Sequence, residues 1–286
     1  MLLASFFFAL MNVAVKQVSH IPAVEVILFR SGVSFVMSWA MLKRQKVSVW
    51  GTHHGLLVMR GVAGALALIL FFITLQNIPL ATAVTIQYLS PIFTTILGIF
   101  IVKEKVKPWQ WVFFLISFSG ILVVEGVDTR VSALYLLLGI GSALFAGLAY
   151  NMIRRLNTRE HPLVIVFYFP LVALPITGLY SIFNWVQPTG WDWAILIFIG
   201  VLTQLAQYYM TMAYQTEEVS KVANLTYIGI IYALFFGFVF FGESYDIWAY
   251  VGMGLVLVGV ILNIRYKHKL TKQEAMATMP SEKMNR

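Results

Sequence analysis

The sequence contains no cysteine, and charged residues make up only 11% of its 286 residues. Without cysteine the chain has no disulfide framework, no thiol nucleophile and no thiolate metal ligand. A soluble domain of this size carries about 25% charged residues. The absence of cysteine therefore excludes a secreted disulfide scaffold, and the shortage of charge excludes a disordered chain and a cytosolic metabolic enzyme.

Motifs that power or catalyse reactions are also absent. There is no G-x-x-x-x-G-K-[ST] phosphate-binding loop, so the chain is not expected to hydrolyse a nucleotide. There is no H-E-x-x-H zinc motif and no G-x-S-x-G nucleophile elbow. His53 and His54 are adjacent, but two neighbouring histidines without further ligands are usually hydrated. We therefore predict no catalytic residue, no metal and no cofactor, and we expect that the protein is not an enzyme.

Hydrophobic residues, in contrast, make up 60% of the chain, and the mean hydropathy is +0.82. This apolar surface requires lipid, where each helical span needs about 20 residues, so ten spans would use roughly 200. The pattern predicts an all-α integral membrane protein with ten transmembrane helices. The apolar runs of spanning length lie near Leu2–Val18, Val24–Leu42, Gly55–Leu75, Ala81–Val102, Trp109–Val124, Ser132–Ile153, Leu163–Phe183, Trp191–Tyr214, Val219–Phe241 and Ile247–Ile264.

The basic residues are concentrated in alternate connections, which predicts the orientation of the chain. One side of the membrane receives Lys43, Arg44, Lys46, Lys103, Lys105, Lys107, Arg154, Arg155, Arg159, Lys221 and the basic tail from Arg265 to Arg286. The other side receives Arg130 and Lys16. Because cytoplasmic connections carry the excess of Lys and Arg, both termini are expected to be cytoplasmic. The net charge of +8 then reports orientation, and no nucleic-acid partner is expected.

Shifting the chain against itself by 139 residues reveals an internal repeat. The aligned identities include Asn12 with Asn151, Gln76 with Gln215, Tyr88 with Tyr227, Glu104 with Glu243, Trp109 with Trp248 and Gly120 with Gly259. Since five helices is an odd number, the second copy enters the membrane from the opposite face, which predicts two inverted five-helix repeats. The expected domains are 1–127, 132–266 and a polar tail, 267–286, without ordered structure. Inverted repeats favour alternating access, although a duplicated scaffold would show the same pattern.

Several motifs resemble one family of membrane proteins. The run from Leu80 to Phe93 (LATAVTIQYLSPIF), followed by Gly98 and Lys103-Glu104-Lys105, resembles the fourth helix of EamA domains. Together with Asn12, Lys16, Arg30 and Gly242-Glu243, the chain to about Tyr266 looks like a ten-helix drug/metabolite transporter of the EamA type. The resemblance implies two EamA repeats, cytoplasmic termini in a bacterial inner membrane, and movement of small metabolites, often outward. One departure is Phe169, which occupies the repeat position of Arg30.

Polar side chains within the predicted spans are candidates for a substrate cavity, because such groups are costly in lipid. Those at or near that depth are Asn12, Glu25, Arg30, Gln87, Asn151, Gln204 and Gln207. In the eighth span a polar stripe follows helical spacing and includes Gln204, Tyr208, Thr211 and Gln215, with Gln207 beside it. The alternative is that the stripe only hydrogen-bonds neighbouring helices.

The fourth and ninth spans carry a second candidate group. Tyr88 and Tyr227 are repeat mates near the middle of these spans, and Gln87 and Pro91 lie beside Tyr88. Pro91 removes one helical hydrogen bond, and broken helices with polar neighbours are where transporters build their sites. We expect these residues to line the cavity; the alternative is a packing kink among core tyrosines.

Three ionisable residues have two interpretations each. Lys16 lies at the predicted outer end of the first span, and Glu25 follows on the same side. Lys16 either contacts Glu25 or snorkels to the interface, or else Lys16 or Arg30 attracts a substrate carboxylate or phosphate. Glu25 is the candidate for proton coupling.

The sequence thus predicts a secondary transporter that moves small organic metabolites, amino-acid-like or otherwise amphipathic, by alternating access and in the export direction. Uptake or exchange of a nucleoside or an S-adenosylmethionine-like metabolite is the first alternative. A channel, a membrane scaffold or an intramembrane enzyme are alternatives from other classes. The expected partners are the metabolite and the lipid bilayer, and a monomer is expected, with a dimer as the alternative.

Overall fold

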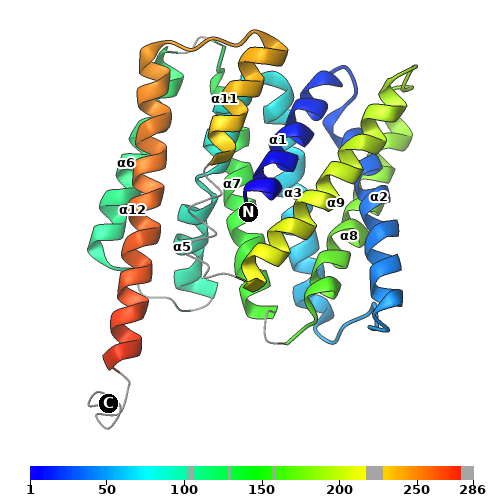
Figure 1. The fold of residues 1–286 in the computed structure, drawn as a ribbon, viewed down its shortest axis with the longest axis horizontal. Coiled ribbons are helices and arrows are strands. Elements are labelled where there is room, and N and C mark those ends of the chain that lie inside the picture. Colours follow the sequence, from blue (N-terminus) through cyan, green and yellow to red (C-terminus); the bar gives the residue numbers. More distant parts are fainter. Residues whose placement is uncertain (102, 104–105, 128–129, 157–158, 217–227, 278–286) are drawn as a thin grey trace.

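The computed structural model describes residues 1–101, 103, 106–127, 130–156, 159–216 and 228–277. Within these ranges the regular structure is α-helical, without a strand (Figure 1). The helices are α1 (Leu2–Gln17), α2 (Ala23–Arg44), α3 (His54–Asn77), α4 (Leu80–Gln87), α5 (Ser90–Ile101), α6 (Pro108–Val127), α7 (Ala133–Leu156), α8 (Pro162–Phe183), α9 (Asp192–Thr216), α11 (Ile228–Phe241) and α12 (Ile247–Ala277).

The described helices have the apolar character that spanning a membrane requires. Six segments are long and apolar enough by length and composition, namely those beginning at Ala23, His54, Leu80, Ala133, Pro162 and Ile247. Shorter apolar helices cover Leu2–Gln17, Pro108–Val124, Asp192–Gln207 and Ile228–Phe241. Each predicted span therefore has a helical counterpart in the described ranges. For the ninth span only the part from Ile228 onward is described.

The fourth predicted span is divided into two helices. α4 ends at Gln87, and α5 begins at Ser90. Pro91 has no N–H to donate to the carbonyl of Gln87, so the α-helical ladder stops at this point. The chain turns tightly instead, with the Leu89 N–H donating to the carbonyl of Ile86 at 3.0 Å. The break that the sequence placed at Pro91 is present.

The C-terminal tail differs from the expectation. Residues 267–277 continue α12, although this part of the tail was expected to lack ordered structure. The segment is rich in Lys, Gln, Glu, Ala and Met, which all have high helix propensity, and it extends an existing helix without a new nucleus. Polarity alone therefore misled the prediction for these residues, and 278–286 lie outside the described residues.

Helices at equivalent positions of the repeat pack against each other. α2 packs on α8 at one end of the molecule and α6 packs on α12 at the other, with α1, α3, α7 and α9 between them (Figure 1). The remaining contacts recur in matched pairs, since α1 packs on α9 as α3 packs on α7, and α2 packs on α9 as α3 packs on α8. The structure thus keeps the duplication that the sequence contains.

The centre and the periphery of the bundle differ in the way that lipid requires. Phe72, Leu75 and Ile86 are completely buried in the central core. Large apolar side chains such as Phe183 and Leu115 are 78% and 71% exposed. Side chains of this kind on the outer surface are stable against hydrocarbon, which is the environment that the composition predicts.

Candidate functional site

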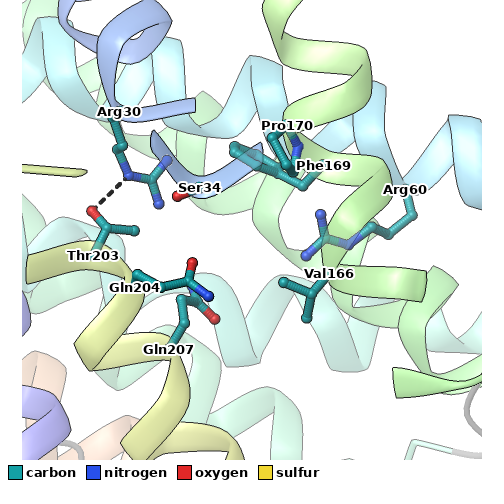
Figure 2. A pocket seen from close by; sticks show the side chains of 9 residues that line it. All are labelled: Arg30, Ser34, Arg60, Val166, Phe169, Pro170, Thr203, Gln204 and Gln207. Atoms are coloured by element: carbon teal, nitrogen blue, oxygen red, sulfur yellow. Dashed lines mark hydrogen bonds between the residues drawn. The ribbon is translucent and has the colours of Figure 1, made fainter. Parts of the chain in front are cut away.

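A small cavity lies between α2, α3, α8 and α9, which places it between the two copies of the repeat (Figure 2). Its volume is about 30 Å³, which is room for water but not for an organic solute. The side chains that line it are Arg30, Ser34, Arg60, Val166, Phe169, Pro170, Thr203, Gln204 and Gln207. In this conformation the cavity is small and partly open, so a metabolite would fit only if the surrounding helices moved apart.

Arg30 enters this cavity from the buried face of α2. That face carries small polar residues, Ser31, Ser34 and Ser38, which let α8 and α9 approach α2 closely. Arg30 is 6% exposed, and its Nε donates a hydrogen bond to Oγ1 of Thr203 at 2.9 Å. Its Nη1 is buried without a hydrogen-bond partner. The guanidinium group is thus held in place through Nε while Nη1 remains unused.

Arg60 reaches the same cavity from α3. As a whole residue it is half-buried, but its Nε and Nη1 are both shielded from solvent and have no hydrogen-bond partner. Figure 2 shows the guanidinium groups of Arg30 and Arg60 pointing toward each other across the cavity. The prediction from sequence missed Arg60, although a basic residue within the predicted span Gly55–Leu75 is the signal that could have identified it.

Phe169 of α8 contacts both arginines. Its ring centroid lies 5.4 Å from Cζ of Arg30 and 5.3 Å from Cζ of Arg60. Phe72 also lies near Arg30, with 5.9 Å between its ring centroid and Cζ. The negative face of an aromatic ring attracts a cation, and this attraction is stronger away from water. Phe169 therefore partly compensates two positive charges and keeps them at one place.

Part of the polar stripe predicted on α9 lines the cavity. Gln204 and Gln207 line the cavity together with Thr203, whose Oγ1 also contacts Sδ of Met11 at 3.0 Å. Tyr208 and Thr211 belong to α9, but their side chains lie outside the described part of the structure, and Tyr227 lies outside it entirely.

The other predicted polar residues lie away from this cavity. Oε1 of Gln87 accepts a hydrogen bond from Ser142 at 2.7 Å, which joins α4 to α7. Nδ2 of Asn151 donates to the carbonyl of Thr94 at 2.9 Å, which joins α7 to α5. Both side chains therefore bind neighbouring helices, as polar groups within spans commonly do.

Three further candidates are also placed elsewhere. The Tyr88 hydroxyl lies against Gly229 at the start of α11, where an added Cβ would come within 2.5 Å of it. Asn12 is buried in α1, and its Oδ1 has no partner. Pro91 is in the first turn of α5. The structure thus does not bring these residues to the cavity that contains Arg30.

Lys16 belongs to a separate cluster at the end of α1. Its Nζ lies 2.6 Å from Oε1 of Glu243 and donates to the carbonyl of Ile78 at 2.6 Å. The Glu243 carboxylate accepts hydrogen bonds from the Leu80 N–H at 2.8 Å and from the Tyr245 hydroxyl at 2.8 Å. Burial, and then the nearby Glu243 charge, raise the pKa of Tyr245, so its hydroxyl stays protonated. The cluster ties α1, the start of α4 and the α11–α12 connection together.

Glu25 is not the partner of Lys16, as one interpretation of the sequence had it. The Glu25 side chain is fully buried, and its Oε2 accepts a hydrogen bond from the Val186 N–H at 3.0 Å. Its Oε1 has no partner. Proximity along the chain suggested Glu25, but the packing of α1 against α11 brings Glu243 to Lys16.

The opposite face of the molecule has a carboxylate clamp that the sequence did not indicate. Oε1 of Glu160 accepts hydrogen bonds from the Thr52 N–H at 2.7 Å and from its hydroxyl at 2.6 Å. His53 contributes its N–H and lies 3.0 Å away through Nδ1. Burial alone would raise the pKa of Glu160, but these hydrogen bonds outweigh it and hold the pKa at about 2. The clamp fastens the α2–α3 connection to the start of α8.

None of these clusters resembles a metal centre. In the ranges that the structure describes, no three His, Cys, Asp or Glu side chains come together as ligands would. The chemistry that the central cavity offers is non-covalent: two guanidinium groups, amides, hydroxyls and an aromatic ring.

Comparisons with known proteins agree with this architecture. The EamA-like transporter family matches the sequence twice, over residues 1–125 and 133–265. The chain is 32% identical over 271 residues to a pseudopaline exporter of Pseudomonas aeruginosa strain UCBPP-PA14, covering 93% of this chain and 94% of that protein. It is 28% identical over 275 residues to human solute carrier family 35 member G1, covering 90% and 75%. It is 25% identical to a riboflavin transporter of Rhizobium johnstonii over 280 residues, covering 96% and 93%.

A solved crystal structure shows the same fold at low sequence identity. The TM-score is 0.66 at 19% identity, and the match covers 94% of this chain and 97% of the other. At 19% identity the match shows a shared arrangement of the helices.

Proposed function

Because the chain belongs to the EamA-like transporter family, we propose that it is a secondary transporter that carries a small organic metabolite through the cavity of Arg30 and Arg60. The observation that carries the proposal is a pair of guanidinium groups, shielded from solvent and with unused donors, between helices of both family matches. α2 and α3 come from the first match, and α8 and α9 from the second. Polar sites between repeats are where secondary transporters bind their substrates.

We propose that the two repeats are inverted and related by a two-fold axis in the membrane plane. The contacts between repeat mates support this. Along α2 and α8, Leu28 lies near Gly178, and the ring centroids of Phe35 and Phe167 are 5.1 Å apart. Later residues of α2 therefore meet earlier residues of α8. Such antiparallel mates require an axis perpendicular to the helices.

The same relation holds at the other end of the molecule. The Ser117 hydroxyl lies 3.3 Å from the carbonyl of Val256, exactly one repeat length later in the chain. A Cβ added to Gly120 would meet the carbonyl of Gly252 at 2.5 Å, so α6 and α12 approach closely and run antiparallel. Two similar halves in opposite orientation can exchange conformations, which would open the cavity to each side in turn.

The cluster of Lys16 and Glu243 supports a gating role. It joins α1 to the start of α4 and to the α11–α12 connection, so it bridges helices of both repeats. In the proposed cycle these contacts hold one face closed and break when that face opens. The contacts lie within hydrogen-bond range and are partly buried, so they would bias the protein toward this closed state.

We further propose export across a bacterial inner membrane, with the Lys-rich connections and both termini in the cytoplasm. The charge distribution supports this orientation. The similarity to a protein named as an exporter supports the direction. Glu25, a buried carboxylate with one oxygen lacking a partner, is the proposed site of proton coupling.

Counterflow in vesicles tests the proposed transport. Purified protein is reconstituted, the vesicles are loaded with one unlabelled metabolite at a time, and uptake of the labelled metabolite is followed. A carrier gives saturable, transient accumulation of the intact solute. Conductance without saturation would indicate a channel, a chemically altered product would indicate an enzyme, and absence of counterflow across a broad panel in folded protein would contradict the proposal.

A further inference from the structure

The central cavity holds more positive hydrogen-bond donors than the protein itself satisfies. Nη1 of Arg30, and Nε and Nη1 of Arg60, are shielded from solvent without a partner. A guanidinium group carries five N–H donors and accepts no hydrogen bond, so only an acceptor can satisfy these atoms. Leaving a charged donor buried without an acceptor is among the costliest arrangements in a protein.

The protein provides no counter-charge at this place among its described residues. The ion pairs among the described residues join Lys16 to Glu243, His20 to Asp192 and His53 to Glu160. These three pairs all lie outside the cavity. Among the described residues that line the cavity there is no Asp or Glu. Two positive groups that face one space repel each other, and the Phe169 ring offsets this only in part. A ligand that carries negative oxygen atoms would supply the missing charge and satisfy these donors.

The walls of the cavity indicate that this ligand has an organic part as well. Val166, Phe169 and Pro170 supply apolar surface on the α8 side. Gln204 and Gln207 supply amide groups on the α9 side (Figure 2). A site built for a bare inorganic anion would surround it with donors and would have no use for an apolar wall or for amide acceptors.

Pro170 gives the α8 wall a further property. Because proline has no N–H, it cannot donate to the carbonyl of Val166 four residues earlier. Both residues line the cavity. The hydrogen-bond ladder of α8 is therefore interrupted beside the cavity.

From these observations we infer that the transported substrate is an organic anion with at least two negative charges, whose carboxylate or phosphate oxygens bind Arg30 and Arg60. The inference rests on the proposed function, since it names the substrate class of the same cavity. Two arginines with separate unused donors match two anionic groups, each bound through charge-assisted hydrogen bonds. The apolar wall of α8 contacts the carbon skeleton between them.

A series of three solutes tests the requirement for charge. Succinate, succinamate and succinamide share one carbon skeleton and lose one carboxylate at each step. Binding to the purified full-length protein is measured by titration calorimetry at millimolar solute, at low and at raised ionic strength. The affinities for glycerol 3-phosphate and glycerol are compared in a second experiment, which separates a preference for phosphate from a preference for carboxylate.

The arginine variants connect binding to the cavity. Arg30→Gln and Arg60→Gln remove one cation each, and Arg44→Gln removes an exposed cation from the same helix as Arg30 as a matched control for net charge. We expect affinity for the dianion to fall by on the order of 30-fold or more in each cavity variant and to stay unchanged in the control. Arg30→Lys and Arg60→Lys should recover part of the loss, because they keep the charge and lose the paired donors.

The outcomes separate this inference from the proposed transport. Any of three results would overturn the inference. The first is equal affinity for succinate and succinamide together with no binding of glycerol 3-phosphate, and the second is that none of the tested anions binds. The third is that the cavity variants and the control have the same affinity. Saturable counterflow of a neutral or cationic solute would then leave the transport function standing alone. Arginine-dependent binding of anions without counterflow would support the site and contradict transport.

Discussion

Arg30 and Phe169 occupy equivalent positions of the two repeats and contact each other, with 5.4 Å between Cζ of Arg30 and the ring centroid of Phe169. Two residues related by a two-fold axis can touch only if they lie close to that axis. The cavity is therefore on the proposed axis, where both halves contribute. The pair is chemically unequal, a cation on one side and its aromatic partner on the other, so the duplicated halves have diverged at the point where they meet.

Replacing Arg60 by Met should stabilise the protein when no ligand is present. The change removes a cation whose Nε and Nη1 have no partner, while the Met side chain fills similar space. We expect a gain of about 1–3 kcal/mol in the free energy of unfolding. Thermal unfolding in detergent measures this, and the anion-induced rise in melting temperature should disappear in the same variant. A loss of stability would mean that Arg60 serves mainly to hold helices together.

Phe169 is expected to position the two guanidinium groups. Phe169→Leu removes the aromatic face that both arginines contact and keeps most of the apolar volume. Affinity for a dianion should fall by about 5- to 30-fold, since a desolvated cation–π contact contributes about 1–2 kcal/mol. Phe169→Tyr keeps the ring and serves as the control. Equal losses in both variants would show that binding does not depend on the aromatic face that contacts the arginines.

The Lys16–Glu243 cluster is expected to control opening at one face. Because the natural chain has no cysteine, a single cysteine at the buried position Val18 can report access with a maleimide. We expect slow labelling in the parent protein and about tenfold faster labelling after Lys16→Met, which breaks the ion pair. Exposed Lys46→Met is the control for removal of a charge. Unchanged labelling would contradict the gating role.

Glu160 should make stability depend on acidity. Its folded pKa of about 2 lies below the ordinary value of 4.5, so the carboxylate favours the folded state above pH 4.5, and this contribution is lost as the pH falls from 4.5 toward 2. Melting temperature measured between neutral pH and about pH 3 should decrease less in Glu160→Gln than in the parent, because the variant has no such carboxylate to protonate. Parallel curves for the two proteins would contradict the assignment.

Glu25 is expected to link transport to protons. Glu25→Gln keeps an oxygen acceptor for the Val186 N–H and removes the titratable group. Transport driven by an imposed pH gradient should be lost, while counterflow without a gradient should remain within about twofold. Asp246→Asn removes an exposed carboxylate of the α11–α12 connection and is the matched control. A full response to the gradient in Glu25→Gln would exclude this residue from coupling.

The sequence predicted the helical spans well because spanning is a local property. In lipid, each spanning helix must satisfy its backbone hydrogen bonds within itself. Hydropathy and the prolines and charges between the apolar runs therefore mark the limits of each span almost independently of the rest of the chain. The break before Pro91 was foreseeable for the same reason. The helical extension beyond Tyr266 was missed because the polarity of those residues was weighed and their helix propensity was not.

The candidate site was only partly predictable. Arg30, Gln204 and Gln207 are polar residues within spans, and all three line the cavity. Arg60 has the same signal and was overlooked. Gln87 and Asn151 carry that signal too, yet they hydrogen-bond neighbouring helices. A polar residue within a span indicates that it avoids lipid, but the residue alone does not reveal what it faces.

Composition, hydropathy and the repeat of 139 residues determined by themselves that this protein is a duplicated bundle of helices for a membrane, because these features act within each helix or recur along the chain. Only the tertiary structure decided which charges meet. It pairs Lys16 with Glu243 across 227 residues and places Arg30 beside Thr203 across 173. It also leaves Arg30 and Arg60 facing one cavity without a counter-charge from the described residues, since the packing of helices distant in sequence sets each group's neighbours.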